Sequence, residues 1–274
     1  MELGSIGVWM RRTLDPSVAA SAEGLGYGAV WLGGSPSVDQ ARPFLEATER
    51  IVVVTGILNI WQHDPADVAA AHARITADFP GRFLLGIGIG HPEATSQYRQ
   101  PLRAMETFFD GLDAATTPVP VEERVTAALR GRMLDLSARR SLGAHPYFVP
   151  SEHTAFARER LGPDVLLAPE VSVAVDDDQS AARERASTWA ARYTALVNYT
   201  RNLRDFGYED RDFENGGSDA LLDAVVPHGP VARVAAGVRA HLDAGADHVC
   251  VQAVGTEDPI ADLEPLAREL GLTD

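Results

Sequence analysis

A short apolar run closed by alternating glycines constrains the fold more than any other part of the sequence. It covers residues 81–92 and reads Gly-Arg-Phe-Leu-Leu-Gly-Ile-Gly-Ile-Gly-His-Pro. Such a run predicts a strand buried on both faces, and Gly86, Gly88 and Gly90 predict a turn where the backbone closely approaches a ligand. The spacing differs from the G-x-G-x-x-G of a dinucleotide-binding fold, which favours a barrel over a Rossmann domain.

Strand-like and helix-like segments alternate along the whole chain, which is typical of parallel βα units. The predicted strands are 5–9, 29–32, 51–58, the run within 81–92, 124–129, 144–149, 165–175 and 248–254. Eight such units predict an α/β fold of the (β/α)8 TIM-barrel type, formed as one domain over residues 1–274. Residues 179–244 are too long for one barrel helix. They predict a helical insertion between strands 7 and 8 that serves as a lid or a dimer surface.

The charge composition excludes several classes of function. The formal net charge of -15 argues against binding to nucleic acid or to an anionic membrane surface. All 24 basic side chains are arginine, which excludes chemistry that needs a lysine amine. Cys250 is the only cysteine and, between two valines, is expected to be a buried apolar side chain. No apolar run is long enough to span a bilayer, so we expect a cytoplasmic protein with a small-molecule substrate.

The loops that follow the strands are expected to hold the active site, as in other barrels of this type. They place these residues there: Trp9, Gly33 to Ser35, Asn59 to His63, Gly88 to His91, Arg130 to Arg132, His145, Glu170 and Gln252. Two guanidinium groups and free amides at the helix start around Gly131 suit a phosphate group. The alternative is a pair of solvated arginines.

The histidine, glutamate and aspartate side chains in or near these loops each have a functional and a structural interpretation. His63 and His91 could donate a proton near neutral pH, or each could only hydrogen-bond its own loop. His145 and Glu170 fall within predicted strands, where they serve a ligand or hydrogen-bond to each other. Residues 176–178 are three aspartates, which are more typical of a helix cap than of a metal site. No metal site is predicted.

Several motifs spread over nearly the whole chain resemble those of the luciferase-like monooxygenase superfamily, and within it the group of coenzyme F420-dependent oxidoreductases. The residues that carry the resemblance are 24–34, 54–59, 80–83, 85–88, 127–130, 143–147, 167–170 and 240–249. The resemblance implies a barrel of the bacterial luciferase-like type that binds a flavin or 5-deazaflavin at the strand ends. It also implies a hydride transfer between that ring and a substrate, and a homodimer.

The resemblance also implies roles for individual residues. Gly56 and Ile57 match a bulged third strand, often with a cis peptide bond, that supports the ring from behind. The residues from Arg130 to Arg132 would hold the phosphate, and His91 occupies the position of an acid in related enzymes. The expected cofactor-binding residues are Gly56, Ile57, Asn59, Gly88, Gly90, Arg130, Gly131, Arg132 and His145. The expected catalytic residues are His91, His63 and Glu170.

The chain departs from relatives that oxidise sugar phosphates in the loop after its second strand, and from relatives in general where Arg130 and Gly131 stand in place of Gly-Pro and in the short region between the fourth and fifth strands. The relatives that oxidise sugar phosphates have Asp-His after the second strand, where this chain has Gly34 and Ser35. The primary expectation, which comes from the resemblance, is an oxidoreductase that uses coenzyme F420. An FMN-dependent luciferase-like enzyme and a non-catalytic flavin-binding barrel are the alternatives.

Overall fold

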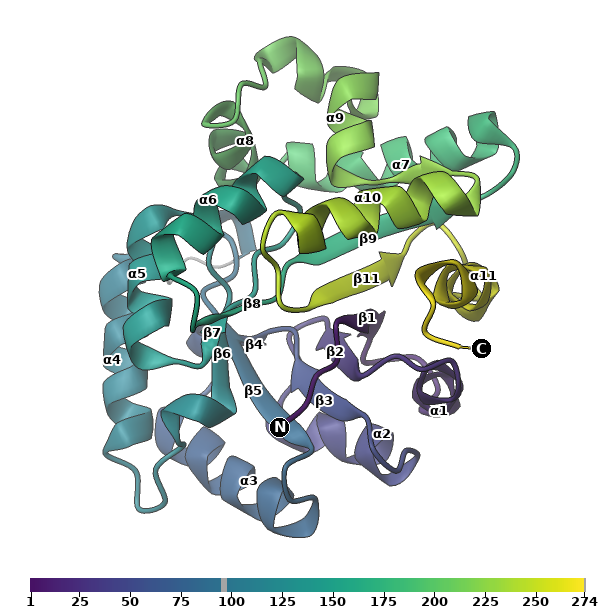
Figure 1. Cartoon of the computed structure of the whole chain (residues 1–274). Coiled ribbons are helices and arrows are strands. Elements are labelled where there is room, and N and C mark those ends of the chain that lie inside the picture. Colours follow the sequence, from purple (N-terminus) through teal and green to yellow (C-terminus); the bar gives the residue numbers. More distant parts are fainter. Residues whose placement is uncertain (95–97, 274) are drawn as a thin grey trace.

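Ten parallel strands follow one another in a curled sheet, and β4 pairs with β5 beside this path (Figure 1). A computed structural model describes residues 1–94 and 98–273 of the chain. The sheet order is β10-β9-β11-β1-β2-β3-β5-β6-β7-β8. The strands are β1 (Ile6–Arg11), β2 (Ala29–Gly33), β3 (Val52–Thr55), β4 (Leu58–Asn59), β5 (Phe83–Gly88), β6 (Arg124–Thr126), β7 (Gly143–Ala144), β8 (Leu166–Leu167), β9 (Glu170–Val175), β10 (His228–Gly229) and β11 (Val249–Ala253). The prediction of an α/β fold with a parallel sheet is confirmed.

Helices cover the outside of the sheet, because parallel strands need crossover connections that lie against its faces (Figure 1). The α-helices are α1 (Ser17–Gly24), α2 (Arg42–Glu46), α3 (Pro65–Asp78), α4 (Pro101–Asp113), α5 (Gly131–Arg140), α6 (Ser151–Leu161), α7 (Gln179–Thr194), α8 (Val197–Arg204), α9 (Asp219–Val225), α10 (Val231–Asp243) and α11 (Ile260–Leu270). Short 3-10 helices are η1 (Val38–Ala41), η2 (Ile60–Gln62), η3 (Pro92–Ala94), η4 (Val121–Glu123) and η5 (Asp210–Gly216). No helix in the described ranges is long and apolar enough to cross a membrane.

Several strands are shorter than the sequence predicts. The strand expected at 51–58 divides into β3 and β4, with the break at Gly56 and Ile57, whose peptide bond is cis. The strand expected at 144–149 ends after two residues: Pro146 has no N–H to donate, and Phe148 has a φ of 54°. The strand expected at 165–175 is interrupted at Pro169, as predicted, and forms β8 and β9.

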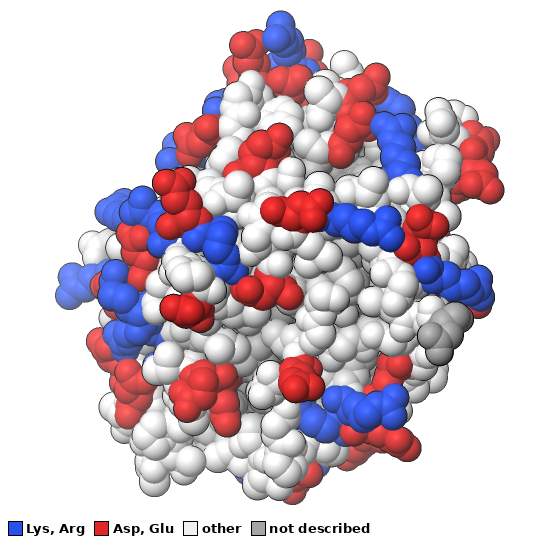
Figure 2. Space-filling view, viewed as in Figure 1, with Lys and Arg blue, Asp and Glu red and all other residues white. Residues whose placement is uncertain are grey.

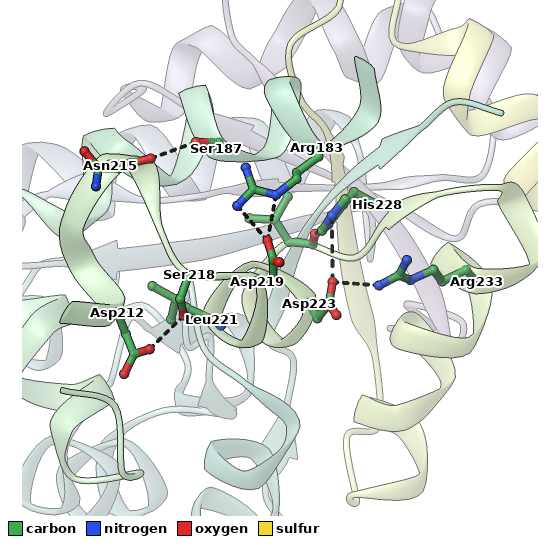
Figure 3. Close-up of polar contacts among 11 residues, drawn as sticks. Arg183, Ser187, Asp212, Asn215, Ser218, Asp219, Leu221, Asp223, His228 and Arg233 are labelled. Atoms are coloured by element: carbon green, nitrogen blue, oxygen red, sulfur yellow. Dashed lines mark hydrogen bonds and ion pairs between the residues drawn. The ribbon is translucent and has the colours of Figure 1, made fainter. Parts of the chain in front are cut away.

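The region after β9 is mostly helical, as predicted, but it also contains the short strand β10, which pairs with β9. Two ion pairs join its helices: Arg183 of α7 with Asp219 of α9, and Asp223 of α9 with Arg233 of α10 (Figure 3). His228 of β10 lies 3.7 Å from the same Asp223 carboxylate. In Figure 1, α8 and α9 stand at the top of the molecule, beyond the strands. These ion pairs connect α7, α9 and α10 to one another, so the helices can hold their side chains in fixed positions beside the ends of the strands.

Candidate functional site

A cavity of about 830 Å³ opens where the strands end. Its walls come from β1, from the ends of β2, β3, β5, β6 and β7 and the loops after them, from the first residues of α4 and α5, and from α7 and α8. The lining residues are Trp9, Arg11, Arg12, Thr13, Gly33, Gly34, Ser35, Gly56, Ile57, Ile89, Gly90, His91, Tyr98, Pro101, Leu102, Ala127, Ala128, Leu129, Arg130, Arg132, Met133, His145, Tyr147, Trp189, Tyr193, Asn198, Tyr199 and Arg201. A cavity of this size, with aromatic walls and a few polar atoms, is typical of a cofactor or substrate site.

The break in the third strand forms one wall of this cavity. The Gly56–Ile57 peptide bond is cis, as the family resemblance implies. Just before it, the Thr55 hydroxyl accepts a hydrogen bond from Gly86 N (2.8 Å) and donates one to Gly86 O (2.7 Å). A Cβ atom on Gly88 would lie 2.8 Å from Ile57 Cδ1. The Ile57 side chain therefore packs closely on Gly88 of β5, and a larger residue at 88 would require it to shift.

Trp9 projects from β1 into the cavity and packs on the backbone of β2. A Cβ atom on Gly33 would lie 1.7 Å from Trp9 Cζ2, so only glycine permits this position of the indole. The indole ring also meets the Tyr147 ring edge-on, with 6.0 Å between the ring centroids. Its Nε1 is buried and has no hydrogen-bond partner among the described residues. A buried N–H without an acceptor is costly, which makes Trp9 Nε1 a candidate donor to a bound ligand.

Two histidines present further buried nitrogens at the cavity. His145 donates through Nδ1 to Ala168 O (2.6 Å), and its ring stacks on Trp31. This bond leaves His145 Nε2 as an acceptor, and no partner for it exists in the described part of the chain. His91 lies with its ring centroid 5.1 Å from that of Tyr199, and its Nδ1 is likewise buried without a partner there.

Burial lowers the pKa of both histidines. The pKa of His145 falls to about 4. The pKa of His91 is also lowered by burial, and the charge of Glu93 opposes part of that fall. Both rings are therefore neutral at pH 7, and each can accept a hydrogen bond there.

Tyrosines of the helical region complete the aromatic wall. The Tyr147 hydroxyl donates to Gln252 Oε1 (2.7 Å) and lies 2.8 Å from the Tyr193 hydroxyl. The Phe148 ring stacks on Tyr193, and Tyr199 packs edge-on against both. Burial raises the pKa of Tyr147 and Tyr199 well above the usual value. These hydroxyls therefore stay protonated at neutral pH.

The arginines at the start of α5 lie at the cavity, as predicted. Arg130 is the N-cap of α5, and its guanidinium is 3.4 Å from an Asp205 carboxylate oxygen. Arg130 and Arg132 both line the cavity and are exposed. Gly131 packs against Arg160, whose Cζ would lie 2.9 Å from a Cβ atom at this position. The helix start therefore offers two guanidinium groups to the cavity, and Gly131 itself faces another side chain.

The cavity collects most of the predicted site residues but not all. Gly56, Ile57, Gly90, His91, Arg130, Arg132 and His145 line it. His63 instead lines a neighbouring, more open pocket of about 430 Å³ with Trp61 and Arg103. Asn59 supports the loop from behind, because its Oδ1 accepts a hydrogen bond from Trp61 N (3.1 Å). Gly88 and Gly131 also lie behind the lining residues.

Glu170 is fully buried behind the aromatic wall. Its Oε1 accepts a hydrogen bond from the Ser172 hydroxyl (2.6 Å), and its Oε2 accepts one from Phe148 N (3.3 Å). Ser172 in turn accepts a hydrogen bond from Trp189 Nε1, which links the carboxyl to a lining residue. Burial raises the pKa of Glu170 to about 8, so it is largely protonated at pH 7. The alternative of a direct hydrogen bond between His145 and Glu170 is wrong, because His145 Nδ1 bonds to Ala168 O and the Glu170 carboxyl bonds to Ser172 and Phe148.

The structure adds site residues that the sequence analysis does not single out. These are an aromatic residue that follows β7, the aromatic residues of α7 and α8, and three further arginines: Tyr147, Trp189, Tyr193, Tyr199, Arg11, Arg12 and Arg201. Arg11 ends β1, and that position after a strand could have identified it. Tyr193 and Tyr199 lie in the helical region, whose placement over the strand ends has no signal in a single sequence.

Two other sequence predictions concern residues outside the cavity. Cys250 is fully buried, as predicted. Asp178 caps α7, since its carboxylate accepts hydrogen bonds from Ser180 N and Ala181 N, which confirms the cap interpretation. Among residues 1–94 and 98–273, no three His, Cys, Asp or Glu side chains are grouped so that they could share a metal ion.

Part of the sequence is similar to a known protein family. Residues 16–117 match the family model for luciferase-like monooxygenases, a segment that contains the broken third strand and His91. Over this segment, which is less than half of the chain, the sequence is similar to luciferase-like monooxygenases. The resemblance predicted from the sequence is thus confirmed. No curated protein sequence matches the chain significantly.

Solved structures of coenzyme F420-dependent enzymes share the fold of the whole chain. An F420-dependent secondary alcohol dehydrogenase, in complex with an F420-acetone adduct, is 14% identical with a TM-score of 0.78, covering 99% of each chain. The coenzyme F420-dependent tetrahydromethanopterin reductase of Methanopyrus kandleri is 15% identical with a TM-score of 0.75, covering 98% of this chain and 99% of that one.

A third similar structure holds a different cofactor. The oxygenating constituent of 3,6-diketocamphane monooxygenase from Pseudomonas putida, in complex with FMN, is 14% identical with a TM-score of 0.66. The match covers 99% of this chain and 96% of that one. At these identities the likeness shows a common fold, which matches the predicted luciferase-like architecture.

Proposed function

We propose that this protein is an oxidoreductase that transfers a hydride between coenzyme F420, a 5-deazaflavin, and a small organic substrate. One observation carries the proposal: three buried nitrogens without partners among the described residues, in Trp9, His91 and His145, line one aromatic cavity beside the cis peptide bond that follows β3. Buried polar atoms need partners, and a ring with oxygen and nitrogen atoms at its edge would supply them. The residues present therefore fit a flavin-like group.

The wall formed by Gly56 and Ile57 would support the cofactor ring from behind, with Asn59 and Gly88 holding that wall in place. Gly90 would allow the backbone to come close to the ring or its side chain, because its φ is 59° and a Cβ atom there would lie 3.0 Å from Asn59 Nδ2. His145 Nε2 would accept a hydrogen bond from the bound group. When bound, the deazaflavin ring supplies the site that gives or takes the hydride.

The start of α5 would hold the phosphate of the cofactor. Arg130 and Arg132 bring two guanidinium groups there, and the first amides of a helix attract anions. Gly131 would keep the turn compact against Arg160. The protein has a net charge of -15, so a local group of arginines is needed to bind any anion.

His91 would exchange the proton that accompanies hydride transfer. Since burial keeps its ring neutral at pH 7, it would accept the proton of a substrate hydroxyl during oxidation and return it in the reverse direction. Glu170 would position Phe148 and, through Ser172, Trp189. His63 would act from the neighbouring pocket on a part of the substrate that extends beyond the cavity.

The same cavity favours one rival function. A flavin such as FMN also has a ring and a phosphate, and the FMN-bound monooxygenase has the same fold. The second candidate is therefore an FMN-dependent luciferase-like monooxygenase. A flavin-binding barrel without catalysis is the third, based on Gly34 and Ser35 in place of Asp-His.

We also infer how the sheet closes. Only Ala168 and Pro169 separate β8 from β9. Backbone hydrogen bonds to β7 and the residues after it continue across this gap, because Ala168 N donates to Ala144 O and Glu170 N donates to Pro146 O. If β8 and β9 act as one interrupted strand, the sheet is a closed (β/α)8 barrel in a single domain. The helices α7 to α9 then form the insertion between strands 7 and 8.

An activity measurement separates the three functions. The protein with reduced F420 would be given a panel of small aldehydes, ketones and activated alkenes, and with oxidised F420 a panel of alcohols, each followed by F420 absorbance. The protein with reduced FMN and oxygen would be followed by oxygen consumption. F420 turnover supports the proposal, and oxygen-dependent product formation supports the monooxygenase. Turnover with neither supports the non-catalytic barrel.

A further inference from the structure

The cavity is far more basic than the protein around it. Five of the 24 arginines line it, and none of its described lining residues is aspartate or glutamate. The face of the molecule in Figure 2 shows the opposite arrangement, with acidic and basic side chains interspersed. Segregation of positive charge in a protein of net charge -15 indicates a site for an anion. The arginines form more than one group, and the proposed cofactor phosphate accounts for only one of them.

The second group lies at the end of β1, across the cavity from α5. Arg11 is the last residue of β1, and Arg12 and Thr13 follow it in the lining. In the sheet order β6, which leads to Arg130, is four places from β1. Strands so far apart in a curled sheet face each other across its interior (Figure 1). One phosphate at the start of α5 therefore leaves the β1 arginines available.

The β1 arginines have few partners of their own. Arg12 Nε donates to Gly34 O (2.9 Å), which orients its guanidinium along the loop after β2. Arg11 makes neither an ion pair nor a side-chain hydrogen bond with any described residue, and it is exposed. Arg11 lines the same cavity as Tyr193.

We propose that Arg11, with Arg12 beside it, binds a carboxylate or phosphate group of the substrate, so that the protein acts on anionic small molecules. The statement that the bound anion is a substrate rests on the proposed function. The anion site itself is inferred from the cavity alone. A guanidinium fork matches both anions with two parallel hydrogen bonds. The aromatic side chains next to it, Trp9 and Tyr193, would contact the apolar part of the same molecule.

Three probes of similar shape test the proposal: benzoate, phenyl phosphate and neutral benzamide. Each would be titrated by calorimetry into the wild type and into Arg11→Gln, Arg11→Lys, Arg132→Gln and Arg139→Gln. Arg139 is the matched control, because it is an exposed arginine on α5 outside the cavity lining. Every titration would be made with the protein alone and with the protein saturated with F420 or FMN.

The wild type is expected to bind at least one anion and to bind benzamide much more weakly. Arg11→Gln is expected to weaken anion binding by about 10- to 100-fold, the usual effect of losing a charge-assisted hydrogen bond. Arg11→Lys should retain part of the affinity, Arg139→Gln all of it, and Arg132→Gln all of it in the cofactor-saturated protein. The preferred anion, carboxylate or phosphate, identifies the group on the substrate.

Two results would overturn the proposal. One is equal binding of benzoate, phenyl phosphate and benzamide by the wild type. The other is unchanged anion affinity in both Arg11 variants. A protein that binds the anion through Arg11 but takes up neither cofactor would contradict the proposed oxidoreductase and leave the anion site standing.

Discussion

The indole of Trp9 lies directly on the backbone of Gly33, where a Cβ atom would be 1.7 Å from Trp9 Cζ2. This contact joins β1 to β2 at the point where both enter the cavity, and it places Trp9 Nε1 beside the cis peptide wall. A Cβ atom on Gly56 would lie 3.3 Å from Trp9 Nε1. Two glycines thus set the position of the buried donor on which the proposed cofactor site depends.

Gly33→Ala should therefore displace Trp9. We expect it to lower the free energy of unfolding by about 1–3 kcal/mol, as overpacking does, and to weaken cofactor binding. Urea unfolding and a cofactor titration measure the two effects. Gly24→Ala is the control, because nothing lies within 4 Å of a Cβ atom there. Unchanged cofactor affinity in folded Gly33→Ala would show that the position of Trp9 is irrelevant to the site.

Thr55→Val should destabilise the break in the third strand. The substitution keeps the shape but removes both hydrogen bonds to Gly86, leaving a buried N–H and a buried C=O without that partner. We expect a loss of about 1–3 kcal/mol in urea unfolding. Thr76→Val, which removes a bond to a carbonyl within α3, should cost less than about 0.5 kcal/mol. Equal small losses in both variants would contradict the importance of the Thr55 bridge.

Glu170 should make the stability of the protein depend on pH. Its pKa is about 8 in the folded chain against an ordinary value of 4.5, so between these values the unfolded chain releases a proton that the folded chain keeps. The free energy of unfolding therefore falls as pH rises through this window, by about 1.4 kcal/mol per pH unit from this group, and levels off above it. Glu170→Gln lacks this contribution.

Urea unfolding of the wild type and Glu170→Gln at three pH values between the ordinary and the raised pKa isolates the effect, because the other groups cancel in the difference. The free energy of unfolding of Glu170→Gln, relative to that of the wild type, should increase as pH rises. Parallel stability curves would mean that Glu170 titrates normally in the folded chain.

Arg132→Ala should weaken binding of the cofactor without changing the fold. Arg132 is exposed and forms no ion pair within the described ranges, so its removal leaves no buried group unpaired. We expect about a tenfold loss of cofactor affinity, smaller at high salt. Arg139→Ala on the same helix should retain the affinity of the wild type. Equal affinities of all three proteins would place the phosphate elsewhere.

Much of the fold could be predicted from the sequence because its signals are local. The buried runs around Val53 and Leu85 and their alternation with helices need no knowledge of distant contacts. The predicted lengths of β6 and β7 are wrong for a different reason. Hydrophobicity continues past Thr126 and Ala144, but the regular strands end there and only single backbone bonds continue, such as the one from Ala127 N to Ile87 O. After β7, Pro146 and the positive φ of Phe148 prevent a longer strand.

The site could be predicted only in part, because most of its lining comes from strand ends and the segments that follow them, and the rest comes from α7 and α8. His91, His145 and Arg130 follow strands, so position alone places them at the cavity. Tyr193 and Tyr199 reach it from α7 and α8, and the sequence contains no measure of how those helices lie over the strands. His63 follows β4, and that position predicts it at the same site. In the structure, however, it lines the neighbouring pocket.

Titration of the purified protein with coenzyme F420 and, separately, with FMN tests the central claim most directly, with cofactor fluorescence and thermal stability as the two readouts. We predict tight, stoichiometric binding of F420 with a rise in the melting temperature, and weaker binding of FMN. Both effects should decrease in Gly33→Ala. Preference for FMN would contradict the F420 assignment, and binding of neither cofactor would contradict the proposed oxidoreductase altogether.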